Sequence, residues 1–236
     1  MGDAAFCGTL LSDNERIRDN AFVSRTRTYL AEYLDLNKFQ TTIINKWKEE
    51  DMQSVNMLMM DATCYESYIR FPTDVKLLWE CCEWLWEKTI PDICKMFKEK
   101  MPRSKFLEQK NKQLFYSKLR RKTHRKTISR KRALLKLLTK GIESLETLLH
   151  KTKGGKLSQK LTACFATIKT IKEQQEYLFK NKASKVSDRI VSLHKPYVRP
   201  IVRGKENKPI EFGVKVHMMQ VDGINIIEHA SYDNFN

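Results

Sequence analysis

The stretch Val55-Asn-Met-Leu-Met-Met-Asp61-Ala-Thr-Cys-Tyr-Glu-Ser67 decides how the rest of the chain is interpreted. The run from Val55 to Met60 is short and almost wholly apolar, which is typical of a strand buried in a sheet. Such a strand would deliver the carboxylate of Asp61 to its end. Because turns that follow strands often contain Asp, residue chemistry alone favours a structural part for Asp61 over a functional one.

A helix is predicted directly after this strand. In Phe71-Pro-Thr-Asp74, the side chain of Thr73 or Asp74 can accept hydrogen bonds from the free N–H groups of a helix start. One side of this helix is apolar and contains Val75, Leu78, Trp79, Cys82, Leu85 and Trp86. Pro91 and Pro102 restrict the backbone before them, so we expect a kink or a short helix between them.

Helical periodicity continues in two other parts of the chain. Leucines recur at three-to-four-residue steps from Lys131 to His150, and apolar residues do so from Leu157 to Leu178. Gly154-Gly155 separates the two segments, which predicts an antiparallel helical hairpin over 131–182. A smaller helical region is predicted from about Asn14 to Asp51, with an inward face made of Tyr29, Leu30, Tyr33, Leu34, Phe39, Ile43, Ile44 and Trp47.

The tail of the chain has a β pattern. Apolar residues alternate with other residues from Phe212 to Val221, and Asp222-Gly223 precedes a second apolar segment from Ile224 to His229. Asp-Gly between alternating segments is a strong signal for an antiparallel hairpin, because both turn positions need positive φ. The expected fold class is therefore α+β and mostly helical.

The chain is strongly and unevenly basic. It has 236 residues and a formal net charge of +16, and the segment 103–136 contains 14 Lys and Arg against one acid, Glu108. This segment carries +13 of the charge, which favours a polyanionic partner such as DNA over a solvated run of charge. We expect DNA contacts from the basic segment and from a second cluster in a proline-rich loop: Arg120, Arg121, Lys122, Arg125, Lys126, Arg130, Lys131, Arg132, Arg189, Arg199, Arg203 and Lys205.

Cysteine usage and hydropathy indicate a cytoplasmic protein. The six cysteines include an adjacent pair and no Cys-x-x-Cys motif, so neither a disulfide framework nor a zinc site is expected. No segment approaches the roughly 20 apolar residues of a membrane span. The first residues, which include Asp3, lack a basic leader, so we expect no secretory signal and no membrane partner.

Two motifs resemble those of a known family. The segment Leu58-Met-Met-Asp61-Ala-Thr-Cys-Tyr-Glu-Ser-Tyr-Ile-Arg-Phe-Pro-Thr-Asp74-Val-Lys-Leu-Leu78 is similar to the first catalytic-strand signature of bacterial insertion-sequence DDE transposases. The segment His194-Lys-Pro-Tyr-Val-Arg-Pro-Ile-Val-Arg-Gly-Lys205 and the strands after it resemble a second segment of the same family. The two motifs occur in the family's order, and the resemblance covers roughly residues 25 to 236.

This resemblance implies a partial ribonuclease H-like core in which Asp61 is the first catalytic, metal-binding carboxylate and Mg²⁺ is the cofactor. It also implies four parts: a helical lead-in (1–54), the first core strand and following turn (55–74), a helical insertion with the basic segment and the helical hairpin (75–187), and a tail with the Arg/Pro loop and core strands two and three (188–236). Besides DNA, the expected partner is another copy of the chain, in a homo-oligomer, or an intact transposase.

The family's other two catalytic carboxylates would follow Asn236, so the resemblance implies a partial protein. Because one carboxylate cannot hold the two Mg²⁺ ions of phosphodiester cleavage, we expect the chain to show no Mg²⁺-dependent DNA cleavage alone. Two alternatives stay open at this point. One is a non-catalytic, basic helical protein that binds nucleic acid, and the other is a structural helical protein whose charge only keeps it soluble.

Overall fold

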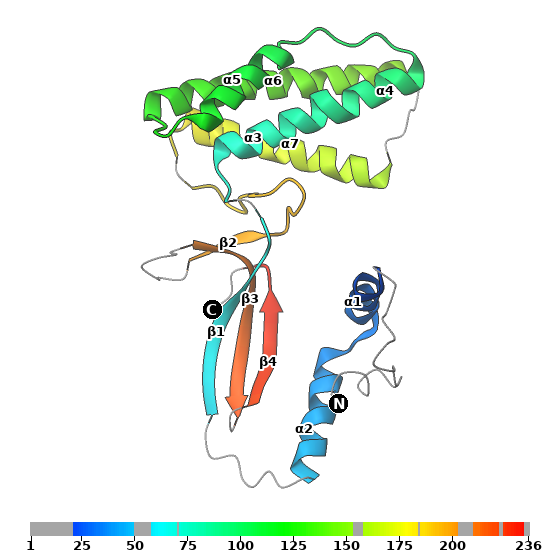
Figure 1. Cartoon of the computed structure of the whole chain (residues 1–236), viewed down its shortest axis with the longest axis vertical. Coiled ribbons are helices and arrows are strands. Elements are labelled where there is room, and N and C mark those ends of the chain that lie inside the picture. Colours follow the sequence, from blue (N-terminus) through cyan, green and yellow to red (C-terminus); the bar gives the residue numbers. More distant parts are fainter. Residues whose placement is uncertain are drawn as a thin grey trace, which may run out of the picture. The chain divides into compact units, whose positions relative to one another are not determined.

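The computed structural model describes residues 21–49, 58–69, 71–152, 158–183, 185–202, 210–221 and 224–233 (Figure 1). The chain divides into two compact units, one of residues 1–58 and 220–226 and the other of residues 59–219 and 227–236. Each is considered separately. The fold is α+β and mostly helical with a small antiparallel sheet, which confirms the predicted class at this level.

Two helices lie in the first unit, α1 (Phe22–Tyr33) and α2 (Leu36–Glu49). The side chain of Asp35 accepts a hydrogen bond from the N–H of Lys38 at 3.0 Å and so helps to start α2. The predicted inward face is wrong for α1, which buries no residue: Tyr29 is 62% exposed and Tyr33 is 65% exposed. Helical spacing identifies an apolar side, but it cannot show whether another element covers that side.

The second unit contains a helical layer. Its elements are α3 (Asp74–Glu83), a π-helical turn η2 (Trp84–Thr89), α4 (Ile90–Phe97), α5 (Phe106–Lys118), α6 (His124–Lys151) and α7 (Gln159–Lys180). The predicted cap of α3 is confirmed, since the hydroxyl oxygen of Thr73 accepts from the N–H of Lys76 at 3.4 Å. The predicted short helix after Pro91 is α4, in which the proline lies in the first turn.

The π-helical turn η2 lies directly before Pro91. A proline has no N–H to donate to the preceding turn, so the hydrogen-bond pattern of a continuous α-helix cannot pass through it. The wider turn from Trp84 to Thr89 joins α3 to α4 at this point. Its residues Trp84, Leu85 and Trp86 are all buried, so this irregular turn belongs to the core.

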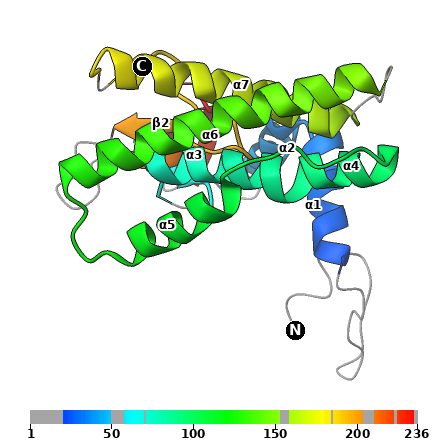
Figure 2. The same ribbon diagram turned by 90° about the horizontal axis from the view of Figure 1, so that it is seen from above.

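Helix α6 is the centre of the layer, in contact with α3, η2, α4, α5 and α7 (Figure 2). Its leucine stripe is buried, as the spacing predicts, and Leu134, Leu138 and Leu145 are fully covered. Two buried polar groups of the α3–η2 helix are satisfied by its backbone: the Sγ of Cys82 donates to the carbonyl of Leu134, and the Nε1 of Trp86 donates to that of Leu137 at 3.3 Å. These two polar atoms of the core are therefore paired, whereas the buried hydroxyl of Thr89 has no hydrogen-bond partner among the described residues.

The sheet is built around β3. Strand β3 (Ile210–Val221) pairs with β1 (Leu58–Glu66), with β2 (Arg199–Val202) and with β4 (Ile224–Ser231). Strands β3 and β4 are the two predicted from the alternating pattern, and residues 222 and 223 between them lie outside the described residues. The helices α3–α7 fall between β1 and β2 in the chain.

Two details of the sheet differ from the prediction. The expected strand Val55–Met60 is instead Leu58–Glu66, so Asp61 lies within the strand and not at its end; residues 50–57 are outside the described part. The reason is that Thr63, Cys64 and Tyr65 also suit a strand, and the ladder continues to the N–H of Ser67, which donates to the carbonyl of Phe212 at 2.7 Å. The proline-rich loop also contains a strand, β2.

Strand β2 contains Pro200, whereas the prolines of this segment predicted a loop. Pro200 is paired in register with Phe212 of β3. A proline is tolerated in an edge strand, because its missing donor does not interrupt a ladder on both sides. A proline-rich segment therefore forms the short edge β2 of this sheet.

Cys81, Cys82 and Cys94 are buried free thiols. Burial raises the pKa of the Cys81 and Cys82 thiols, so both stay protonated and behave as small apolar side chains. Within the residues that the structure describes, none of the helices combines the length and the apolar character that crossing a membrane requires.

Candidate nucleic-acid interface

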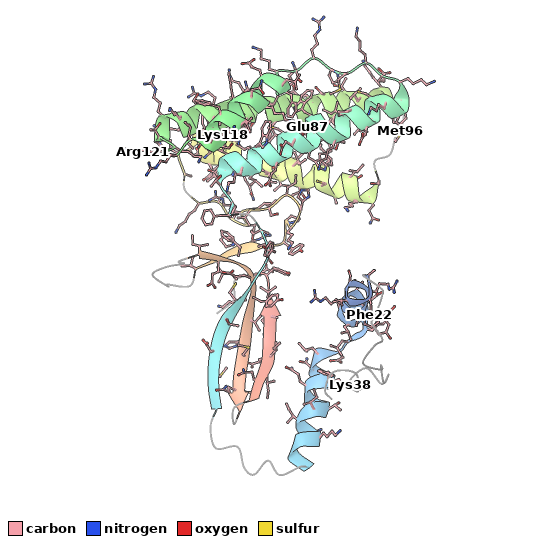
Figure 3. The ribbon with its side chains drawn as sticks, in the orientation of Figure 1. Phe22, Lys38, Glu87, Met96, Lys118 and Arg121 are labelled. Atoms are coloured by element: carbon pink, nitrogen blue, oxygen red, sulfur yellow. The ribbon has the colours of Figure 1, made fainter. Side chains whose placement is uncertain are left out.

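The link between α5 and α6 is the most concentrated basic part of the described structure. Helix α5 ends at Lys118 and α6 begins at His124, so the cations between them are placed at a helix-to-helix corner. Five predicted DNA contacts lie here with exposed side chains: Arg120, Arg121, Lys122, Arg125 and Lys126. Figure 3 shows the side chains of Lys118 and Arg121 at this corner. In the described part of the chain, none of the five forms an ion pair with a carboxylate.

The basic surface continues along α6. Arg125, Arg132, Lys136 and Lys140 are exposed and follow one another at steps of seven, four and four residues. These steps keep the side chains on one face of a helix over about 22 Å. The guanidinium of Arg132 lies over the ring of Phe179, 5.8 Å from its centroid, which orients it without neutralising its charge. We call this row the α6 basic face.

Lys136 and Lys140 of the α6 basic face were missing from the residues predicted to contact DNA. The density of Lys and Arg in the sequence falls after Arg132, so charge density alone does not identify these two lysines. The signal that identifies them is the four-residue spacing from Arg132, because it places all three on the same side of a helix.

Arg130 has a structural role, unlike the exposed cations near it on α6. It is only 6% exposed, and its guanidinium donates to the side-chain oxygen of Gln113 at 2.8 Å and to two oxygens of Gln109 at 2.6 and 2.7 Å. Burial lowers the pKa of Arg130, and each of its three guanidinium nitrogens donates to a neutral acceptor. It joins α5 to α6 from inside, so we leave Arg130 out of the interface.

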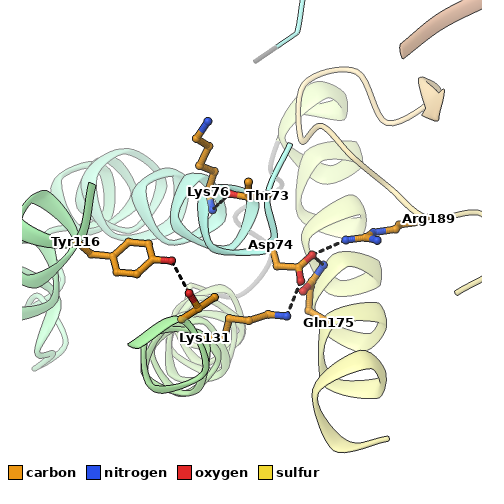
Figure 4. Close-up of polar contacts among 8 residues, drawn as sticks. Thr73, Asp74, Lys76, Tyr116, Lys131, Gln175 and Arg189 are labelled. Atoms are coloured by element: carbon orange, nitrogen blue, oxygen red, sulfur yellow. Dashed lines mark hydrogen bonds and ion pairs between the residues drawn. The ribbon is translucent and has the colours of Figure 1, made fainter. Parts of the chain in front are cut away.

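Lys131 and Arg189 are also engaged, because both form ion pairs with Asp74 (Figure 4). The same carboxylate accepts a hydrogen bond from the Nε2 of Gln175 at 3.1 Å. Burial would raise the pKa of Asp74, but the hydrogen bond and charge of Lys131, followed by the charge of Arg189, outweigh it and lower that pKa. This Asp74 cluster joins the start of α3 to α6, α7 and the segment before β2, so its two cations are structural.

The remaining predicted contacts lie near β2. Arg199 is half-buried, and its Nη1 donates to the carbonyls of Pro196 and Val198, which holds the side chain against its own loop. Arg203 and Lys205 fall outside the described residues. Among the described residues, the two predicted clusters meet at Asp74, which pairs with Arg189 of the second cluster and Lys131 of the first.

A groove with a volume of about 840 Å³ lies between α5 and α6. Apolar residues and cations share its lining, which includes Phe115, Leu119, Ala133, Arg125 and Lys126. Phe115 is 68% exposed although it belongs to a helix of a packed layer. The sequence pattern does not single out Phe115, because an aromatic residue inside a basic run is ordinarily a core residue.

Asp61 lies on β1 with an exposed carboxylate, and one of its oxygens accepts from the N–H of Ala62 at 2.7 Å. Among the described residues, no group of three or more His, Cys, Asp or Glu is arranged to hold a metal ion. Asp61 is therefore an exposed carboxylate that, within the described residues, does not belong to such a group.

Comparison of the chain with protein-family models, with curated proteins and with solved structures found no match.

Proposed function

We propose that this chain binds DNA through the α5–α6 corner and the α6 basic face, as part of an insertion-sequence transposase of the DDE type. The observation that carries the DNA-binding proposal is the set of exposed cations at the corner and on α6, which lack carboxylate partners in the described structure. Surface cations are normally interspersed with acids, and their concentration on one surface is the electrostatic signature of a polyanionic partner.

The arrangement suits contact with the phosphate backbone. The α6 basic face extends over about 22 Å, a length that corresponds to about six base-pair steps of duplex DNA. Its cations lie on a rigid helix whose other side is locked in the core by Leu134 and Leu138. Contacts of this kind supply affinity and orientation and are largely independent of sequence.

The test is the salt dependence of binding to a short duplex, measured by fluorescence anisotropy. For each phosphate contact, the logarithm of the affinity falls with the logarithm of the salt concentration with a slope of about −0.9. The double variant Lys136→Gln/Lys140→Gln is expected to weaken binding and to reduce the magnitude of this slope by about 2. Both side chains are exposed, so the fold should be unaffected.

The matched control is Lys88→Gln/Lys95→Gln, which removes two exposed cations from the η2 and α4 turns. It lowers the net charge by the same amount and should leave the slope unchanged. If both double variants reduce affinity and slope equally, the effect comes from net charge alone and the α6 basic face is not the interface.

The transposase part of the proposal rests on Asp61 and on the strand arrangement. Support comes from the central strand β3, which is flanked by β1 with Asp61 and by β4, as the resemblance implies for core strands one to three. Because Asp61 lies outside the α5–α6 surface, Asp61→Asn should leave duplex affinity unchanged in the same assay. A loss of affinity in Asp61→Asn would instead place Asp61 among the DNA-binding residues and remove the reason to regard it as a metal ligand.

The second candidate is a helical nucleic-acid-binding protein without catalysis. The same basic surface supports it, and the lack of a three-ligand cluster among the described residues is compatible with it. The two candidates differ in Asp61. Only the first gives that exposed carboxylate a function.

A further inference from the structure

Besides the α6 basic face, the second unit contains the Asp74 cluster, a small cavity lined by Phe71, Val191 and His194, and the α5–α6 groove. The first is fully explained by packing, and the second is a modest space of about 300 Å³. The groove combines an exposed aromatic ring with unpaired cations. The groove is therefore the feature best suited to bind a ligand.

We propose that the α5–α6 groove binds an unpaired nucleotide of single-stranded DNA, with its base against Phe115 and its phosphate near Arg125 and Lys126. This inference rests on the proposed DNA-binding function and adds a ligand class to it. A volume of about 840 Å³ is within the range of sites that bind small organic ligands. The groove can therefore accommodate a nucleotide.

The chemistry of the lining favours a nucleotide. Phe115 supplies a ring face on which any base can stack, and Asn111 and Ser129 add polar groups beside it. Arg125 and Lys126 are exposed at the same groove, and none of the described residues that line it is acidic. Lys112 also lines the groove but is paired with Glu108, so it contributes less charge.

The occupant should be single-stranded. In a duplex each base face is covered by its neighbours, so a ring such as Phe115 can stack only on a base that has left the helix. A second copy of this chain is a poorer occupant, because it would bring the same cations to the surface and the like charges would repel. An exposed aromatic among cations thus points to an unpaired base.

The experiment compares a single-stranded oligonucleotide containing 2-aminopurine with a duplex of the same sequence. Stacking on Phe115 should quench the 2-aminopurine fluorescence when the strand binds. Phe115→Ala should weaken single-strand binding about 5- to 100-fold and abolish the quenching, while duplex affinity stays within about two-fold. Phe115→Tyr keeps an aromatic ring and should retain both the affinity and the quenching.

Tyr177→Ala serves as the matched control, since Tyr177 is an exposed aromatic of α7 outside the groove and is 52% exposed. It should change neither signal. The proposal is overturned if Phe115→Ala weakens single-strand and duplex binding equally, or weakens neither. It is also overturned if sedimentation shows that Phe115→Ala separates a dimer while oligonucleotide affinity is unchanged, because the groove would then be a contact between copies.

These outcomes are separable from failure of the proposed function. If duplex binding still depends on Lys136 and Lys140 but Phe115→Ala has no effect on the single strand, only the groove inference fails. If replacing Lys136 and Lys140 leaves duplex affinity unchanged, the proposal that the α6 basic face binds DNA is wrong.

Discussion

Asp74 is a residue at which three tertiary polar contacts of the helical layer converge. Its carboxylate accepts from Lys131 of α6, Gln175 of α7 and Arg189 of the segment that leads to β2. Its side chain is 22% exposed, so these interactions are shielded from water more than surface ion pairs are. One carboxylate thereby fixes four segments of the chain.

Replacing this carboxylate should destabilise the protein in a pH-dependent way. At pH 7 we expect Asp74→Asn to lose about 3 kcal/mol of unfolding free energy, because Lys131 and Arg189 are left without their counter-charge. The pKa of Asp74 is lowered in the folded state from an ordinary value of 3.8. The stability it provides is therefore present above about pH 4 and is lost as the pH falls through the lowered pKa.

Urea unfolding at pH 7 and at pH 3 checks this expectation. The difference between wild type and Asp74→Asn should be large at pH 7 and smaller at pH 3. Glu173→Gln, an exposed position of α7 without an ion pair in the described structure, should change stability little at either pH. An equal difference at both pH values would show that packing, and not charge, accounts for the effect of Asp74.

For single residues, the sequence shows which side chains are cationic, but it does not show which of them are buried in the folded protein. Arg125 and Arg130 are five positions apart in one basic run, yet Arg125 is exposed and Arg130 is 6% exposed against Gln109 and Gln113. Which face of α6 is covered depends on where α5 packs, and no local pattern contains that information. The cap at Thr73 was predictable because capping involves only adjacent residues.

At the scale of elements, the pairing of β1 with β3 depends on Gly213. A Cβ at this position would lie 2.0 Å from the carbonyl oxygen of Tyr65, a backbone atom that cannot move aside without separating the strands. Gly213→Ala should therefore cost about 3 kcal/mol of unfolding free energy and disrupt the β1 edge. Hydrogen exchange at the Ser67 amide, which donates to Phe212, reports this pairing directly.

Gly141→Ala is the matched control, since it makes the same chemical change in α6. There the added Cβ would meet side-chain atoms of Leu85 and Trp86 at 2.9 Å, and helix propensity favours alanine by up to about 1 kcal/mol. It should leave exchange at Ser67 unchanged. If Gly213→Ala also leaves that exchange unchanged, the close approach of the two strands is not needed for pairing.

The elements themselves were predictable to different degrees. The leucine spacing of α6 predicts a buried stripe, because helical periodicity is a property of a single segment. The true extent of β1 was not predictable, since Asp61 interrupts its apolar pattern and only the neighbouring β3 holds the strand in the sheet as far as Glu66. The π-helical turn η2 likewise depends on both Pro91 and the core around it.

At the scale of the whole molecule, folding gathers the cations of segment 103–136 onto α5, α6 and the corner between them. This raises the local charge density and with it the self-repulsion of the folded state. A polyanion that binds this surface should bind the folded protein more tightly than the unfolded chain, in which the same charges are spread out.

Short duplex DNA should consequently raise the melting temperature of the protein. At a concentration of about 100 times its Kd the expected gain is about 2.7 kcal/mol, or roughly 5–10 °C for a chain of this size. The gain should disappear at about 0.5 M salt, as counterion release requires. Lys136→Gln/Lys140→Gln should show a smaller gain at low salt, and a gain that does not depend on salt would contradict an electrostatic surface.

The order of the strands has a further consequence, which concerns how the protein reaches its fold. The amide of Ser67 after β1 bonds to Phe212 of β3, 145 positions later in the chain, and α3–α7 lie between them. Contacts among successive helices close short loops and form quickly, whereas pairing across such a separation is slow. During synthesis β1 leaves the ribosome long before β3 has been made. The helical layer can therefore form while β1 is still unpaired.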